Sequence, residues 1–88
     1  CIFDLHLPAS QSLKEKRQPI KSIKDSLKSR FNVSVCEFGN TNLWQRTSLA
    51  VSMVAAHEDP IRETFENVRR RIESKGEVMV VDLITEFY

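Results

Sequence analysis

Five cations between residues 12 and 30 recur at alternating spacings of three and four, an arrangement that could contact a row of phosphates. These cations, which we call the basic flank, are Lys14, Arg17, Lys21, Lys24 and Lys28. At about 100° per residue they fall on one side of a helix, and the opposite side carries uncharged serines. The sequence therefore predicts a phosphate-contacting ridge. A merely solvated helix face is the alternative that the pattern leaves open.

The segment that carries the basic flank has the signals of a helix. Ser12 followed by Glu15 is a capping-box pattern, which predicts a helix start near Leu13. An apolar stripe lies about a quarter-turn from the basic flank. Its residues are Leu13, Ile20, Ile23 and Leu27. Pro19 lacks the N–H that the helix needs, at a cost of about 3 kcal/mol. We expect a kink there, and a helix that begins near Pro19 is the alternative.

Other residues could take part in binding or chemistry. Trp44 and Arg46 stand at the end of a predicted hairpin, where a ring beside a cation could stack on a base. The alternative, which we prefer for Trp44, is that it covers the edge of a thin core. Spacing does not distinguish an acid–base or metal cluster of His6, Asp4 and Asp82 from unrelated polar residues. With two glycines the chain has no glycine-rich phosphate loop. We therefore expect no enzyme activity, no metal and no cofactor.

Composition sets the class of protein. The 88 residues predict one domain, 1–88, and the net charge of +1 means that any nucleic-acid role depends on local clustering. The two cysteines, Cys1 and Cys36, lack the paired spacing of a zinc site and are interpreted as reduced thiols. No apolar run approaches the roughly 20 residues that cross a bilayer, so we expect a soluble cytoplasmic protein. Because the chain begins at Cys1 without Met, we also expect the native N-terminus to lie outside this sequence.

Alternating and helical patterns predict strands at 1–7, 33–38, 46–56 and 78–87, with helices after the first and third strands. Asp59 is the expected cap of the second helix, Pro60 its first residue and Gly76 its stop. The order predicts an α+β, ferredoxin-like βαββαβ fold, with both helices on one face of a four-stranded antiparallel sheet and the first strand central.

The opposite, open face of this sheet is expected to carry small or polar residues. They are Asp4, His6, Cys36, Ser48, Ala50, Ser52 and Asp82. On the last strand, alternation puts Met79, Val81, Leu83 and Phe87 on one face, and Val80, Asp82, Ile84 and Glu86 on the other. The small residues would let a partner or a second copy pack closely, and a plain wetted sheet is the alternative.

Four pieces of the chain together resemble a known family. They are His6-Leu7-Pro8, residues 12–17, residues 30–35 and Leu43-Trp44-Gln45-Arg46. The sequence is similar to the bacterial domain-of-unknown-function family 503, also called YlxP-like. The resemblance implies a small ferredoxin-like protein, often encoded near translation and ribosome-maturation genes, with no established activity.

We therefore expect a non-catalytic RNA- or ribosome-associated binding module that uses its basic first helix, with RNA or a ribosomal subunit as partner. The predicted nucleic-acid-binding residues are Lys14, Arg17, Lys21, Lys24, Lys28, Trp44 and Arg46. The alternative is a protein-interaction or homodimerisation domain that uses the open sheet face. No membrane partner is expected.

Overall fold

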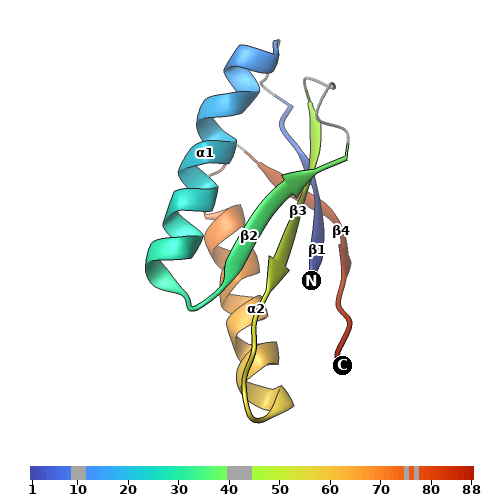
Figure 1. The fold of residues 1–88 in the computed structure, drawn as a ribbon. Helices are drawn as coiled ribbons and strands as arrows, with labels where there is room; N and C mark the ends of the chain where they lie inside the picture. The colour runs from blue at the N-terminus through green and yellow to red at the C-terminus, as the bar shows by residue number, and fades with distance from the viewer. Residues whose placement is uncertain (9–11, 40–44, 75, 77) are drawn as a thin grey trace.

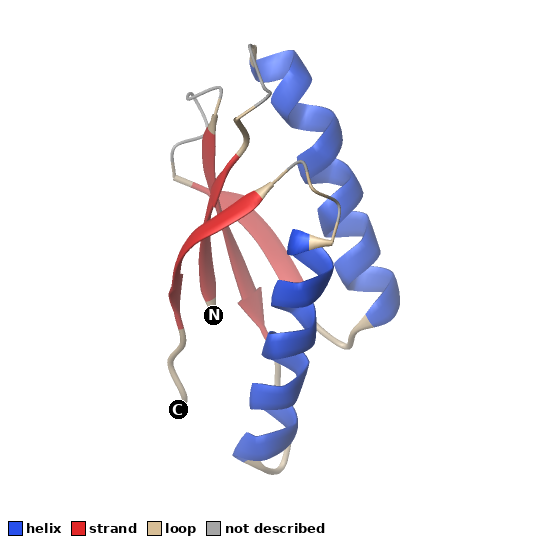
Figure 2. Cartoon of the chain, turned by 180° about the vertical axis from the view of Figure 1, so that it is seen from behind, coloured by secondary structure: helices blue, strands red, loops and turns tan. Residues whose placement is uncertain are grey.

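The computed structural model describes residues 1–8, 12–39, 45–74, 76 and 78–88. Its elements are β1 (Ile2–His6), α1 (Leu13–Arg30), β2 (Ser34–Phe38), β3 (Arg46–Ser52), α2 (Glu58–Glu73) and β4 (Met79–Ile84). The strands form one antiparallel sheet in the order β2-β3-β1-β4 (Figure 1). Both helices lie on the same face of this sheet (Figure 2). The predicted α+β, ferredoxin-like architecture and the central first strand are confirmed.

The helix that carries the basic flank begins where the capping box predicts. The Ser12 Oγ accepts a hydrogen bond from the Glu15 N–H at 3.1 Å, and α1 then continues through Pro19 to Arg30. The alternative of a start near Pro19 is wrong. Ile20 and Ile23 are almost fully buried, and burial of each such side chain is worth about 1.5–3 kcal/mol, enough to offset the proline.

The core lies between the sheet and the two helices. It consists of Phe3, Leu5, Leu7, Ile20, Ile23, Leu27, Leu49, Val51, Phe65, Val68, Ile72 and Val78. Every one of α1, α2, β1 and β3 contributes residues at the spacing that alternation or helical periodicity predicts. This packing fixes which flank of each helix is left to solvent.

The start of α2 differs from the prediction. The N-cap is His57, without a side-chain cap hydrogen bond, whereas Asp59 and Pro60 lie within the first turn. Pro60 is tolerated there because the first N–H groups of a helix have no partner, and Asp59 favours the positive end of the helix dipole. The helix ends before Gly76, whose φ of 71° confirms the left-handed stop.

β3 and β4 are shorter than the strands predicted at 46–56 and 78–87. β3 ends at Ser52 because β2 begins opposite it at Ser34, and among the described residues no strand continues the pairing beyond Ser52. For the same reason β4 ends at Ile84, which pairs with Ile2 at the start of β1. A strand extends only as far as its neighbours supply hydrogen bonds.

A β-bulge breaks the predicted alternation of β4. Asp4 pairs with Asp82 but Leu5 pairs with Val80, so Val81 is an extra residue. The expectation that Val81 shares a face with Leu83 is wrong, because the bulge turns Val81 outward and brings Val80 inward. Met79 also points outward and is 54% exposed, with Val81 at 45%. The bulge therefore makes the open face more apolar than alternation predicts.

Candidate nucleic-acid interface

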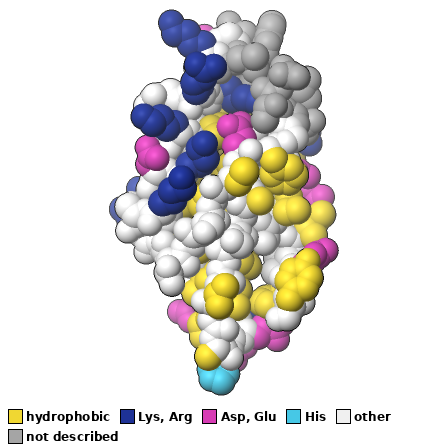
Figure 3. Space-filling view, in the orientation of Figure 1, with side chains coloured by type: hydrophobic (Ala, Val, Ile, Leu, Met, Phe, Trp, Pro, Cys, Tyr) yellow, Lys and Arg dark blue, Asp and Glu magenta, His cyan; other side chains and the backbone are white. Residues whose placement is uncertain are grey.

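The basic flank lies on an unusually positive helix. α1 contains seven basic and two acidic residues, a net charge of +5 in a chain whose total is +1. Four of the five flank side chains are exposed and Lys24 is half-buried. Within the described ranges, none of the five forms an ion pair with an acidic side chain. Figure 3 shows the cations gathered over α1. The flank therefore presents five cations that no ion pair within the described ranges engages.

The contacts of α1 with α2 fix the direction of this flank. The Arg71 Nε of α2 donates a hydrogen bond to the Ser26 Oγ at 2.7 Å, so the serine side of α1 faces α2. Ser26 and Lys24 are about 160° apart around the helix. The basic flank consequently lies on the side of α1 away from α2, toward the β2 edge of the sheet (Figures 1 and 3).

The arginines of α2 are engaged in contacts. Arg62 pairs with Glu58 at 2.9 Å, Arg69 with Glu73 at 3.2 Å and Arg70 with Glu66 at 3.8 Å, each four residues apart. Arg71 contacts Ser26, and Arg62 also lies over the Phe87 ring at 4.6 Å. The run Arg69-Arg70-Arg71 is therefore compensated within the fold, unlike the basic flank.

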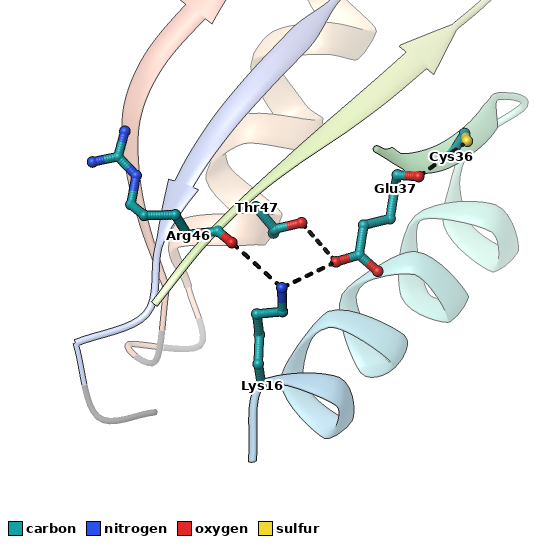
Figure 4. A network of polar contacts seen from close by, with 5 residues as sticks. All are labelled: Lys16, Cys36, Glu37, Arg46 and Thr47. Carbon is teal, nitrogen blue, oxygen red and sulfur yellow. Dashed lines mark hydrogen bonds and ion pairs between the residues drawn. The ribbon is translucent and has the colours of Figure 1, made fainter. Parts of the chain in front are cut away.

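One cation of α1 is buried and was missed by sequence reasoning. The Lys16 side chain lies between α1 and the β2–β3 hairpin, and the residue is 4% exposed. Its Nζ donates to the Arg46 carbonyl oxygen at 3.4 Å and lies 3.9 Å from the Glu37 Oε2, which also accepts a hydrogen bond from the Thr47 hydroxyl at 2.6 Å (Figure 4). We call Lys16, Glu37 and Thr47 the inner polar cluster.

The inner polar cluster had a signal in the sequence. Lys16 stands four residues before Ile20 on the apolar stripe, and Glu37 follows Val33 and Val35 on the inward side of β2. A lysine and a glutamate at two core-facing positions indicate a buried pair. The cluster also turns the Glu37 carboxylate inward, toward Lys16 and Thr47.

The structure separates Arg46 from the basic flank. Its backbone carbonyl oxygen accepts the hydrogen bond from Lys16 of α1, while its guanidinium points away from the cluster (Figure 4). Arg46 pairs with His6, so its side chain emerges on the open sheet face. Trp44, predicted to stack on a base, lies outside the described residues. The structure therefore brings together five of the seven predicted residues.

Residues 1–85 match the family described as "Protein of unknown function (DUF503)". The chain is also 34% identical over 77 residues to the "Uncharacterized protein YlxP" of Bacillus subtilis (strain 168), a match that covers 88% of this chain and 84% of that protein. The chain belongs to the DUF503 family. The resemblance noted in the sequence is thereby confirmed, and the DUF503 match spans all six elements of the fold.

The open sheet face of this DUF503 protein combines acidic and apolar residues. Asp4 and Asp82 are directly opposite on neighbouring strands; Asp4 accepts a hydrogen bond from the Ser48 hydroxyl, and Asp82 from the Leu83 N–H. Across the described ranges, His, Cys, Asp and Glu side chains form no group of three that could hold a metal ion. Each of the two carboxylates therefore has a hydrogen-bond donor within the sheet.

A shallow hollow of about 330 Å³ lies at the end of this face where β1 begins. Its walls include Ile2, Cys36, Ala50, Ile84 and Tyr88. The Tyr88 hydroxyl donates to the Glu86 carboxylate at 2.6 Å, and this hydrogen bond raises the pKa of Tyr88. Neither α1 nor α2, the helices that the structure describes, is long and apolar enough to span a membrane.

Proposed function

We propose that this DUF503 protein is a non-catalytic module that binds RNA through the basic flank of α1. The observation that carries the proposal is the contrast in charge pairing between the helices. The arginines of α2 have carboxylate or hydroxyl partners, whereas the basic flank keeps five cations without ion pairs in the described part of the chain. An RNA partner implies a cytoplasmic location.

The physical basis of such binding is electrostatic. Lysine and arginine side chains that neutralise phosphates release condensed counterions, so affinity falls as salt rises. If all five flank residues contact phosphates, the logarithm of affinity falls with the logarithm of salt with a slope between about −3.5 for a single strand and −4.5 for a double strand. The net charge of +1 for the whole chain makes binding through general attraction weak, so the flank itself must supply the affinity.

Co-sedimentation with purified ribosomal subunits across a salt series tests the proposal. The wild type is compared with the double variant Lys21→Glu/Lys24→Glu, which reverses two neighbouring charges of the basic flank. We expect salt-sensitive binding by the wild type, and a loss of at least about tenfold in the variant. Circular dichroism establishes that the variant is folded.

The matched control is Arg69→Glu/Arg70→Glu on α2, which changes the net charge of the protein by the same amount. Both arginines are solvent-exposed enough to tolerate substitution, with side-chain exposures of 43% and 72%. We expect this variant to bind like the wild type. Equal loss in the two variants would assign binding to overall charge, and no binding by folded wild type at low salt would refute the proposal.

A second candidate function is self-association through the open sheet face. Three large apolar residues of β4 are 45–54% exposed there: Met79, Val81 and Ile84. Small residues such as Ala50 and Ser52 lie on β3, which β1 separates from β4, and they allow close approach of a second sheet. Four strands about 4.8 Å apart and about six residues long give each protomer a face of roughly 400 Å². A dimer would then bury roughly 800 Å² in total, less than the roughly 1,200 Å² of a stable specific interface, so the contact should be weak.

Sedimentation equilibrium tests this second function. We expect a weak dimer whose formation depends on protein concentration but not on salt, because the contact is apolar. Ala50→Arg should abolish it, and Lys21→Glu/Lys24→Glu should not. A monomer at all concentrations would exclude self-association without affecting the proposal for the basic flank.

A further inference from the structure

We infer that the RNA bound by the basic flank is a double helix, recognised through its phosphates and without reading of base sequence. This inference rests on the proposed function of α1. It follows from the regular spacing of the cations along one rigid helix and from the lack of aromatic residues on that helix.

The first step is the rigidity of the row. α1 is one 18-residue helix, and at 1.5 Å per residue the cations from Lys14 to Lys28 extend over about 21 Å. The helix is held to the sheet by Ile23 and Leu27, which are almost fully buried, and by the contacts of Lys16. The backbone positions that carry the charges are therefore fixed relative to one another, and this regular spacing suits a ligand whose phosphates are also regularly spaced, as those of a double helix are.

The second step concerns bases. Proteins that bind single strands combine a basic groove with aromatic side chains on which successive bases stack. α1 contains no aromatic residue, and Phe31 at its C-cap packs against the core. A double helix keeps its bases stacked internally, and double-stranded RNA is recognised mainly through phosphates, 2′-hydroxyls and shape. The basic flank has the groups that such a ligand requires.

The third step concerns the centre of the open sheet face, which is poorly suited to unpaired bases. On the described open face, the middle strands β1 and β3 present no aromatic side chain, because Phe3 points into the core. Asp4 and Asp82 lie near the centre of that face and repel phosphates. Phe38, 40% exposed on the edge strand β2, and the Arg46 side chain lie at the β2–β3 end of this face, so its centre along β1 offers a single strand neither stacking nor favourable charge.

Fluorescence anisotropy with labelled RNA tests the inference. A 12-base-pair RNA duplex is compared with a 24-nucleotide oligouridine, which has nearly the same number of phosphates but no paired bases. A row of about 21 Å covers roughly six steps of a double helix, so this duplex is long enough. We expect the full chain to bind the duplex about tenfold more tightly than the oligouridine in 50 mM salt.

Further measurements separate the inference from the function on which it rests. A second duplex of unrelated sequence should bind equally, and the salt slope should be about −4.5. Lys21→Gln/Lys24→Gln should reduce that slope by about 1.8, whereas Arg69→Gln/Arg70→Gln should leave it unchanged. Equal or tighter binding of oligouridine, or a marked preference between the duplexes, would overturn the inference alone. No binding of any of these RNAs in 50 mM salt would overturn the proposed function as well.

Discussion

The two helices pack on the same sheet face but use charge in opposite ways. α1 has seven basic and two acidic residues, and α2 has four basic and five acidic residues over a similar length. In α2 three arginines have a glutamate four residues away, which stabilises a helix by about 0.2–0.5 kcal/mol per pair. In α1 the corresponding neighbours are often like charges, such as Arg17 with Lys21 and Lys24 with Lys28.

Like charges four residues apart destabilise a helix by about the amount that opposite charges stabilise it. The pattern of α2 is therefore what folding stability alone would favour, and the pattern of α1 is not. Burial of Ile20, Ile23 and Leu27 must offset the repulsion along the basic flank. A charge arrangement that weakens the fold points to a role outside folding, which is why the comparison supports binding by α1 and not by α2.

The largest expected effect tests whether packing is equal in the two helices. Leu27→Ala in α1 and Ile72→Ala in α2 each remove a fully buried side chain, and each should lower the free energy of unfolding by about 2–5 kcal/mol. Urea denaturation measures both losses. Similar losses would mean that the helices differ in charge and not in packing. A loss below about 1 kcal/mol in one helix would show that packing differs too. As a control, Lys28→Ala at an exposed position should change the free energy of unfolding by no more than about 0.5 kcal/mol.

A smaller effect is expected at the inner polar cluster, where α1 uses a cation for structure. Lys16→Met leaves the Glu37 carboxylate without its cation, and we expect a loss of about 1–3 kcal/mol, reduced because Glu37 is partly exposed. Lys16→Met/Glu37→Gln should recover most of it, since the neutral amide oxygen still accepts the Thr47 hydrogen bond. Urea midpoints of both variants provide the measurement. A double variant no more stable than Lys16→Met would show that the lysine's own packing matters, not the charge pair.

The sequence predicted the fold well because each element has a strong local signal. Strand alternation, helical periodicity and the capping box are enough to predict the six elements. They do not predict features that depend on neighbouring strands. The alternation of apolar and polar residues could not predict the bulge at Val81. Val80 and Val81 are equally apolar, so the sequence does not indicate which of them faces the core. The end of β3 at Ser52 depends on where β2 begins, which is a tertiary property.

The candidate site was predictable in part. Helical spacing groups the five cations of the basic flank correctly, but whether they have ion-pair partners depends on side chains from other elements. The burial of Lys16 could have been suspected from its place on the apolar stripe, although long lysine side chains often reach solvent from such positions. Strand alternation alone would have assigned Arg46 to the face of Ser48, away from α1.

The smallest expected effect is the most specific to the comparison of the two helices. Removing one positive charge should change the free energy of unfolding in opposite directions in α1 and α2. Lys24 has Lys21 and Lys28 as helical neighbours, so Lys24→Gln should raise the free energy of unfolding by about 0.2–0.5 kcal/mol at low salt. Arg70 pairs with Glu66, so Arg70→Gln should lower it by a similar amount. Thermal unfolding at about 20 mM and 0.5 M salt should show the difference shrinking as salt screens surface charges.

The same pair of variants links stability to binding. Lys24→Gln should make the protein more stable but weaken its binding to the RNA duplex, whereas Arg70→Gln should make it less stable and leave binding unchanged. Opposite responses of this kind identify a side chain whose charge serves a ligand at the expense of the fold. If Lys24→Gln changed neither property, the unpaired charge of α1 would be an ordinary solvated surface, and the contrast between the two helices would carry no functional meaning.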